Sequence, residues 1–133
     1  MGAKIRFANP IPFVKDIQVS TQFYRDVLGL KVLEDAQAFV LFEDHFSIHQ
    51  AREILDTVFG EAPGSDPQTQ GRDNLLLYFE TDDLDEMFAR VKNHVTLIHP
   101  IVQQAWGQRV FRFYDPDCHI VEIGEPSVYT FEE

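Results

Sequence analysis

The pattern of apolar and polar positions predicts one order of elements in the first half of the chain. An extended, strand-like stretch over residues 4–14 precedes a helical pattern that begins at Asp16 and ends at Gly29. Three short strands are expected next, at residues 31–34, 38–42 and 46–50. A short helix over residues 52–59 completes this half.

The same order returns in the second half, after a polar loop rich in Gly and Pro at residues 61–73. A strand is expected over residues 74–79, and a helix begins at Asp83 with Glu86 as its capping-box partner. Three more strands are expected, at residues 96–99, 109–114 and 119–124. The chain is therefore predicted to be α+β, with two βαβββ modules at about 4–60 and 74–126 in a single domain, 1–133.

The two modules align residue by residue. Residues 9–14 match residues 74–79 at an offset of 65, and residues 47–49 match residues 120–122 at an offset of 73. Since side chains alternate along a strand, six residues of the two first strands are expected on the face that the helices leave open: Asn9, Ile11, Phe13, Asn74, Leu76 and Tyr78.

Composition and charge narrow the class of protein. The 133 residues are 44% hydrophobic and 25% charged, an ordinary soluble globular composition. The net charge of −11 argues against nucleic-acid and membrane-surface binding, because an acidic surface repels phosphates and anionic lipids. No apolar run approaches the about 18 residues of a membrane span. The single Cys118 cannot form an intrachain disulfide, which favours a cytoplasmic location.

Three segments resemble the vicinal-oxygen-chelate superfamily, which includes glyoxalase I, extradiol dioxygenases, fosfomycin-resistance transferases and metal-free bleomycin-resistance proteins. The resembling segments are residues 14–17, 20–30 and 111–122, the last with the turn Asp115-Pro116-Asp117 before a strand glutamate. The resemblance implies a glyoxalase/bleomycin-resistance-like fold, in which the paired modules form an open, cup-shaped mixed sheet. It also implies a homodimer.

Metal-using members of that superfamily place ligands on the first and last strand of each module. Carried over by register, these positions are Asn9, His49, Asn74 and Glu122. Only His49 and Glu122 are strong donors for a divalent transition metal, because amide oxygens bind such ions poorly. An Arg that helps glyoxalase I hold glutathione is replaced by Phe13, which argues against standard glyoxalase I activity.

His49 and Glu122 have two interpretations. They form a partial metal site or a catalytic acid–base pair, or they are a hydrogen-bonded pair that satisfies polar groups inside the cup. Both interpretations stay open at this stage.

Arg112 and Trp106 also have two interpretations each. The resemblance directs Arg112 into the cup, where it suits a carboxylate or phosphate ligand, whereas a salt bridge to Glu122 or Glu53 would neutralise it. Trp106, followed by Gly107, caps the opening of the cup or packs at a dimer contact.

The remaining polar groups are expected to be structural. Cys118 stands where the superfamily has Gly: a positive φ there would strain the turn, and the alternative interpretation of Cys118 is a catalytic thiol. Three histidines are expected in solvated turns or loop edges: His45, His94 and His99. A carboxylate run is expected to be a solvated helix start: Glu80, Asp82, Asp83, Asp85 and Glu86.

Two functions follow. The first is a small-molecule-binding protein of the glyoxalase/bleomycin-resistance type with an incomplete metal site. Its predicted pocket consists of Asn9, Phe13, His49, Asn74, Tyr78, Trp106, Arg112 and Glu122. The second is a metal-dependent lyase, isomerase or dioxygenase in which His49 and Glu122 hold the ion. The cofactor is accordingly none or a divalent metal ion. The acidic surface favours a cationic ligand, whereas Arg112 favours an acidic one. The sequence therefore does not identify the ligand.

Overall fold

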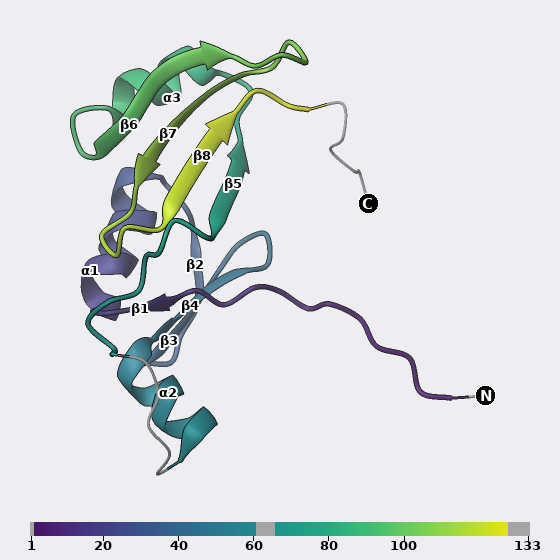
Figure 1. The fold of residues 1–133 in the computed structure, drawn as a ribbon, viewed down its shortest axis with the longest axis vertical. Coiled ribbons are helices and arrows are strands. Elements are labelled where there is room, and N and C mark those ends of the chain that lie inside the picture. Colours follow the sequence, from purple (N-terminus) through teal and green to yellow (C-terminus); the bar gives the residue numbers. More distant parts are fainter. Residues whose placement is uncertain (1, 61–65, 128–133) are drawn as a thin grey trace. The chain divides into compact units, whose positions relative to one another are not determined.

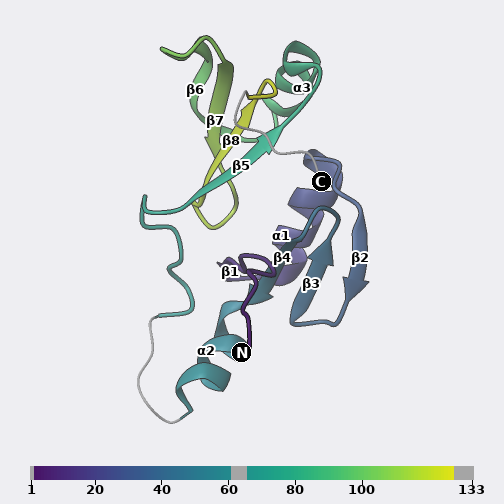
Figure 2. The same cartoon turned by 90° about the vertical axis from the view of Figure 1, so that its right-hand side faces the viewer.

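A computed structural model of the chain describes residues 2–60 and 66–127. It contains two compact units, Met1–Thr69 and Gln70–Glu133 (Figures 1 and 2). Residues 61–65 of the predicted connecting loop lie outside the described residues. No helix in the two described stretches has the length and apolar character needed to cross a membrane.

The first unit contains one four-stranded sheet and its helices. Its elements are β1 (Phe13–Val14), α1 (Ile17–Gln22), the π-helical turn η1 (Phe23–Val27), β2 (Val32–Asp35), β3 (Phe39–Phe42), β4 (Phe46–Gln50) and α2 (Ala51–Phe59). The strand order is β1-β4-β3-β2, with β1 parallel to β4 and the other pairs antiparallel.

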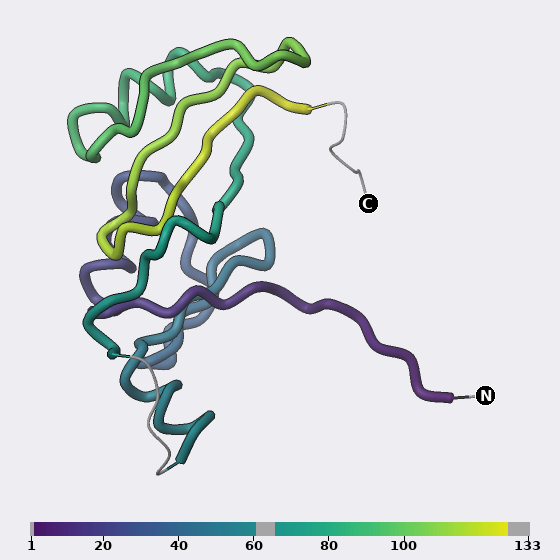
Figure 3. The backbone as a smooth tube through the Cα atoms, viewed as in Figure 1, coloured from purple at the N-terminus to yellow at the C-terminus, as the bar shows by residue number. Residues whose placement is uncertain are grey.

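The second unit repeats this topology, as the backbone trace shows (Figure 3). Its elements are β5 (Leu76–Glu80), α3 (Leu84–Val91), β6 (Thr96–Gln103), β7 (Arg109–Tyr114) and β8 (Ile120–Gly124). The strand order is β5-β8-β7-β6, again with one parallel pair, β5 with β8. The predicted α+β class and the two βαβββ modules are confirmed.

Local sequence signals set the ends of the helices. The Asp16 side chain caps α1, and the Asp83 side chain accepts a hydrogen bond from the Glu86 main-chain N–H at 3.0 Å, as the pattern predicts. A capping box would have the Glu86 carboxylate accept a hydrogen bond from the Asp83 N–H. In the structure the Thr81 hydroxyl accepts this hydrogen bond instead, at 3.3 Å. Gly29 ends the first helical segment with φ 81°, a conformation that glycine adopts without strain.

Each sheet buries one face against its helix. In the first unit the Tyr24 ring lies 4.9 Å from that of Phe46, and in the second the Phe88 ring lies 5.0 Å from that of Phe111. The residues fully shielded on these faces include Val14, Val40, Phe42, Ile48, Phe111, Phe113 and Val121. Burying each such side chain contributes about 1.5–3 kcal/mol.

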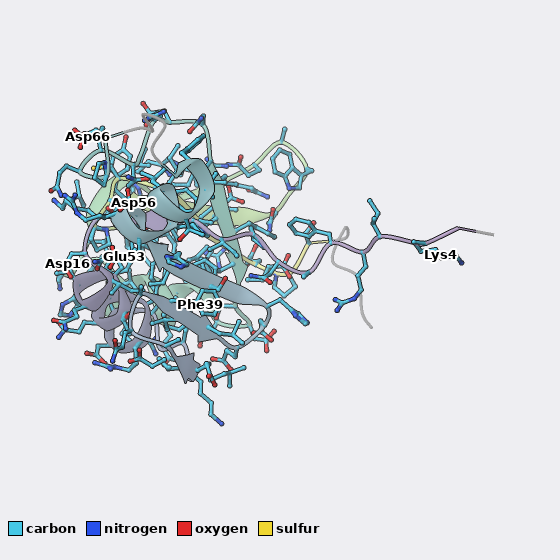
Figure 4. All side chains as sticks on the ribbon, turned by 90° about the horizontal axis from the view of Figure 1, so that it is seen from below. Lys4, Asp16, Phe39, Glu53, Asp56 and Asp66 are labelled. Carbon is cyan, nitrogen blue, oxygen red and sulfur yellow. The ribbon has the colours of Figure 1, made fainter. Side chains whose placement is uncertain are left out.

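The first strand is shorter than expected. Of the stretch 4–14, only Phe13–Val14 pairs with β4. The reason is visible in the sequence, since Pro10 and Pro12 have no N–H to donate to a ladder. The preceding residues run away from the sheet of their unit, with Lys4 near the far end (Figure 4).

Candidate functional site

One row of four side chains crosses the open face of the second sheet. Tyr78 on β5 is paired with Glu122 on β8, Glu122 with Arg112 on β7, and Arg112 with His99 on β6. Paired residues on adjacent strands present their side chains to the same face. Phe111 alternates with Arg112 and packs against α3, so the row lies on the face away from the helix.

Arg112 is the centre of this row. Its Nε donates to Glu122 Oε1 at 2.7 Å, and its Nη2 donates to Gln104 Oε1 at 3.3 Å. Its Nη1 lies 3.0 Å from His99 Nε2. A guanidinium only donates hydrogen bonds, so Nε2 of His99 is the acceptor and Nδ1 carries the proton. This tautomer agrees with the 2.7 Å contact from Nδ1 to the Pro100 carbonyl.

The Glu122 carboxylate is held by this ion pair in a buried place. Glu122 is 6% exposed, and burying a carboxylate without a counter-ion is costly. Of the two partners expected for Arg112, the structure therefore confirms Glu122. Glu53 instead accepts hydrogen bonds from Gln50 Nε2 at 3.1 and 3.2 Å. The expectation that His99 is a solvated loop residue is wrong, because β6 extends through it and brings it to Arg112.

Tyr78 connects the row to a second group of polar side chains. Its hydroxyl donates to Glu80 and accepts a hydrogen bond from Gln108 Nε2 at 2.8 Å. Burial, and next the hydrogen bond to Glu80, raise the pKa of Tyr78 to about 12, so the phenol stays neutral. Gln108 Oε1 accepts from Trp106 Nε1 at 3.0 Å, which fixes the orientation of the indole.

Gln108 has room for these contacts because it lies over a glycine. A Cβ added to Gly124 would come within 2.7 Å of Gln108 Nε2. Gly107, with φ 96°, allows the β6–β7 hairpin to turn next to Trp106. The Trp106 side chain is left 59% exposed, and its role as a cap or a dimer contact stays a prediction.

The corresponding row of the first unit is mostly apolar. Phe13 on β1 is paired with His49 on β4, and His49 with Phe39 on β3. The offsets of 65 and 73 map these three onto Tyr78, Glu122 and Arg112, the residues similarly paired in the second unit, so the predicted register of the repeat is confirmed.

Of the other predicted ligand positions, His49 is the middle residue of the first row, whereas Asn9 and Asn74 lie outside the rows, ahead of β1 and β5. His49 Nδ1 is 3.1 Å from the Gln50 carbonyl oxygen. Asn9 precedes β1 and donates from Nδ2 to Ser47 Oγ at 2.7 Å, while Asn74 is exposed ahead of β5. His49 and Glu122 belong to different units, and their association stays a prediction.

Neither unit by itself presents a donor set that fits a divalent transition metal. Among residues 2–60 and 66–127, no group of three or more His, Cys, Asp or Glu side chains is arranged to hold an ion. The strongest donor, Glu122, is engaged by a guanidinium at 2.7 Å, and Asn9 and Asn74 offer only neutral amides. An ion at Glu122 would have to displace Arg112.

The turn before β8 has the strain that its sequence predicts. Cys118 has φ 65°, a left-handed conformation that costs a residue with a Cβ about 1 kcal/mol. Asp115 Oδ1 holds the turn by accepting from the main-chain N–H groups of Asp117 and His119, at 2.9 and 2.8 Å. A Cβ on Gly71 would lie 2.2 Å from the Cys118 carbonyl oxygen. Only glycine therefore fits at position 71, where the main chain packs against this turn.

The carboxylates at the start of α3 are exposed as expected, and only Glu80 of the predicted run is not. Asp85 pairs with Arg109 at 3.0 Å, and Arg109 also pairs with Glu125 at 3.1 Å. These contacts lower the pKa values of both carboxyls, through hydrogen bonds from Arg109. Glu80 accepts from Tyr78 and from the Ser127 N–H, so it belongs to the site instead of the helix start.

The repeated βαβββ topology, with a polar row where metal ligands would stand, defines a two-module protein of the glyoxalase and bleomycin-resistance type. The chain belongs to the family of the Glyoxalase-like domain, whose model matches residues 7–127. This confirms the predicted membership of the vicinal-oxygen-chelate superfamily.

Three known proteins illustrate the range of its relatives. It is 53% identical to a protein of unknown function from Agrobacterium tumefaciens str. C58, whose crystal structure matches with a TM-score of 0.86 over 95% of this chain and 98% of that one. It is 28% identical to the uncharacterized protein YraH of Bacillus subtilis (strain 168), over 83% of this chain and 90% of YraH. A lactoylglutathione lyase from Agrobacterium tumefaciens is 22% identical with a TM-score of 0.71, over 98% of this chain and all (100%) of the lyase, which shows the shared fold alone.

Proposed function

We propose that the protein binds a small molecule on the open face of its second sheet and does so without a metal ion. The observation that carries this proposal is the ion pair between Arg112 and Glu122. In metal-using members of the superfamily, the residue at the position of Glu122 is a metal ligand. Here the Glu122 carboxylate forms an ion pair with Arg112 on the neighbouring strand.

Arg112 retains capacity to bind a ligand. A guanidinium has five N–H groups, and Arg112 uses three of them on Glu122, His99 and Gln104. The other two have no partner among the described residues, and the side chain is 26% exposed. They suit a carbonyl, carboxylate or phosphate oxygen of a ligand.

Aromatic surface lies beside this donor. Tyr78 is 44% exposed in the row itself, and Gln108 links its hydroxyl to the indole of Trp106. Small-molecule sites combine apolar and aromatic walls with a few placed polar groups. In the first unit, Phe13 and Asn9 are the proposed counterparts. Location in the cytoplasm stays a prediction from Cys118.

Metal content and melting temperature test the metal-free part of the proposal. Protein purified without chelator should contain no stoichiometric metal, and added Zn²⁺, Ni²⁺, Mn²⁺ or Fe²⁺ should not raise its melting temperature. Stoichiometric metal, or stabilisation abolished by His49→Ala and Glu122→Ala, would support the alternative, a metal-dependent lyase, isomerase or dioxygenase.

A ligand screen tests the binding part. Trp106 is the one tryptophan in the sequence, so its fluorescence reports on this face. Compounds that change the emission should bind at least about tenfold more weakly to Arg112→Leu, since a charged hydrogen bond is worth 1.5–3 kcal/mol. The matched control is Arg25→Leu, which removes an exposed arginine paired with Asp26 in the first unit. Equal loss in both variants, or hits indifferent to both, would reject the assignment to Arg112.

A further inference from the structure

The ion pair on the open face of the second sheet has an unused acceptor as well as unused donors. Glu122 Oε1 accepts from Arg112 Nε at 2.7 Å, while Glu122 Oε2 accepts no hydrogen bond from a described residue. Every buried side-chain nitrogen or oxygen of the described residues has a hydrogen-bond partner, so Oε2 is open to solvent. The pair therefore offers a ligand a negatively charged acceptor beside the two remaining N–H groups of Arg112.

The two charges of this pair balance each other before any ligand binds. An anion bound to Arg112 alone would bring a second negative charge next to Glu122, which is 6% exposed. A cation bound to Glu122 alone would bring a second positive charge next to Arg112. Both repulsions are strong where water is partly excluded. A ligand with one charge of each sign adds no net charge and places an opposite charge on each member of the pair.

Tyr78 favours a cation on the Glu122 side of the pair. Tyr78 is paired with Glu122 across β5 and β8, and its ring is partly exposed. The face of an aromatic ring attracts an ammonium group. The Tyr78 hydroxyl also donates to Glu80, so the hydrogen-bonded network around the ring contains a second carboxylate. An ammonium near Glu122 would therefore be attracted by both the ring and the surrounding carboxylates.

The size of the ion pair limits the spacing of the two charges in the ligand. The free donors and the free acceptor belong to one guanidinium and one carboxylate whose nearest atoms are 2.7 Å apart. Charged groups on the same or neighbouring carbon atoms, as in an α-amino acid, match this spacing. The exposed rings of Tyr78 and Trp106, which Gln108 links by hydrogen bonds, provide a surface for an apolar side chain.

We infer that the ligand of the second sheet is a compact ampholyte of the α-amino acid type with an aromatic or apolar side chain. Its acid group binds the free N–H groups of Arg112, and its ammonium binds Glu122 Oε2 beside the Tyr78 ring. This inference rests on the function proposed above and names the class of ligand. It also reconciles the two indications of the sequence, in which the net charge of −11 favours a cation and Arg112 favours an acid.

Three probes that share a phenyl ring test this inference by isothermal titration calorimetry. L-Phenylalanine carries both charges, 3-phenylpropanoate lacks the amine, and 2-phenylethylamine lacks the acid. L-Phenylalanine should bind at least about tenfold more tightly than either of the others, because each missing group gives up a charge-assisted hydrogen bond. Its binding should also change the emission of Trp106, which locates the probe on this face. This comparison needs no variant protein.

The variant Glu122→Gln tests the assignment of the ammonium to Glu122. Its amide oxygen still accepts from Arg112 Nε, but the negative charge is lost. Binding of L-phenylalanine should weaken by at least about tenfold, and binding of 3-phenylpropanoate should not weaken. Glu53→Gln, the same exchange at an exposed carboxylate of the first unit, is the matched control and should leave all three affinities unchanged. Far-UV circular dichroism confirms that both variants are folded.

The outcomes separate this inference from the proposed function. If 3-phenylpropanoate binds as tightly as L-phenylalanine, the ampholyte is overturned, while loss of that binding in Arg112→Leu still supports a small-molecule site. Equal affinity of Glu122→Gln and the unaltered protein for L-phenylalanine overturns the ampholyte as well. Failure of all three probes to bind at about 10 mM also overturns it, and the ligand screen with Arg112→Leu then decides the proposed function separately.

Discussion

Removing Arg112 should destabilise the second unit strongly, because it leaves the Glu122 carboxylate buried without a counter-ion. The Glu122 side chain is 8% exposed and that of Arg112 is 26% exposed, so the pair is shielded mainly on the carboxylate side. Breaking a buried pair by deleting one partner costs about 3–5 kcal/mol. Since water reaches part of Arg112, we expect Arg112→Leu to cost about 2–4 kcal/mol.

The measurement is urea unfolding followed by Trp106 fluorescence, which reports on the second unit. A double-mutant cycle isolates the pair: Arg112→Leu, Glu122→Leu and the two together. The double variant should recover most of the loss, because apolar groups of similar size replace a buried pair at little cost. Glu122→Gln should cost less than Arg112→Leu, since its amide oxygen still accepts from Arg112 Nε.

A coupling energy below about 1 kcal/mol, the range of exposed ion pairs, would refute a buried pair. An Arg112→Leu variant that unfolds at the same urea concentration as the unaltered protein would refute it equally. Either result would mean that Glu122 is hydrated in solution and available to other ligands, metal ions included.

Three further predictions concern neighbouring groups. Burial raises the pKa of Tyr78 from 10.0 to about 12, so the unfolded chain loses this proton first and stability should fall between pH 10 and 12. The loss should be about 1 kcal/mol after discounting for the exposure of the ring, and Tyr78→Phe should lack it in absorbance titration and unfolding at high pH. The Cβ of Gly124→Ala would lie 2.7 Å from Gln108 Nε2, so this substitution should displace the Gln108 amide, cost about 1–3 kcal/mol and shift the emission of Trp106; an unchanged spectrum would contradict the contact. Cys118→Gly should raise stability by about 0.5–1 kcal/mol by relieving φ 65°, and a lower melting temperature would show that the turn is unstrained.

Short-range signals in the sequence predicted most of the fold. Asp16 and Asp83 mark the starts of helices because a cap acts within one turn. The internal repeat predicted that Phe13 corresponds to Tyr78 and His49 to Glu122, and the structure pairs Phe13 with His49 as it pairs Tyr78 with Glu122. The short first strand could also have been predicted, from the two prolines before it.

The partners of Arg112 were harder to predict. Whether residue 99 faces Arg112 depends on two irregularities in the pairing of β6 with β7, on either side of His99. A shift of one residue would turn His99 to the opposite face. The contact of Gln108 with Gly124 likewise needs three-dimensional neighbours, because the two are 16 residues apart in the sequence. Alternation alone carries no such information.

The two rows differ in the residue that neighbours each predicted ligand position. Phe39 and Arg112 occupy the same place in the repeat, next to His49 and Glu122. An aromatic ring beside His49 leaves the imidazole nitrogens to other partners, with the ring centroids 6.0 Å apart. A guanidinium beside Glu122 instead engages the carboxylate at 2.7 Å and takes up the charge that would attract a cation. For the metal-free binding protein proposed above, the residue one strand away from a ligand position therefore matters as much as the ligand positions themselves.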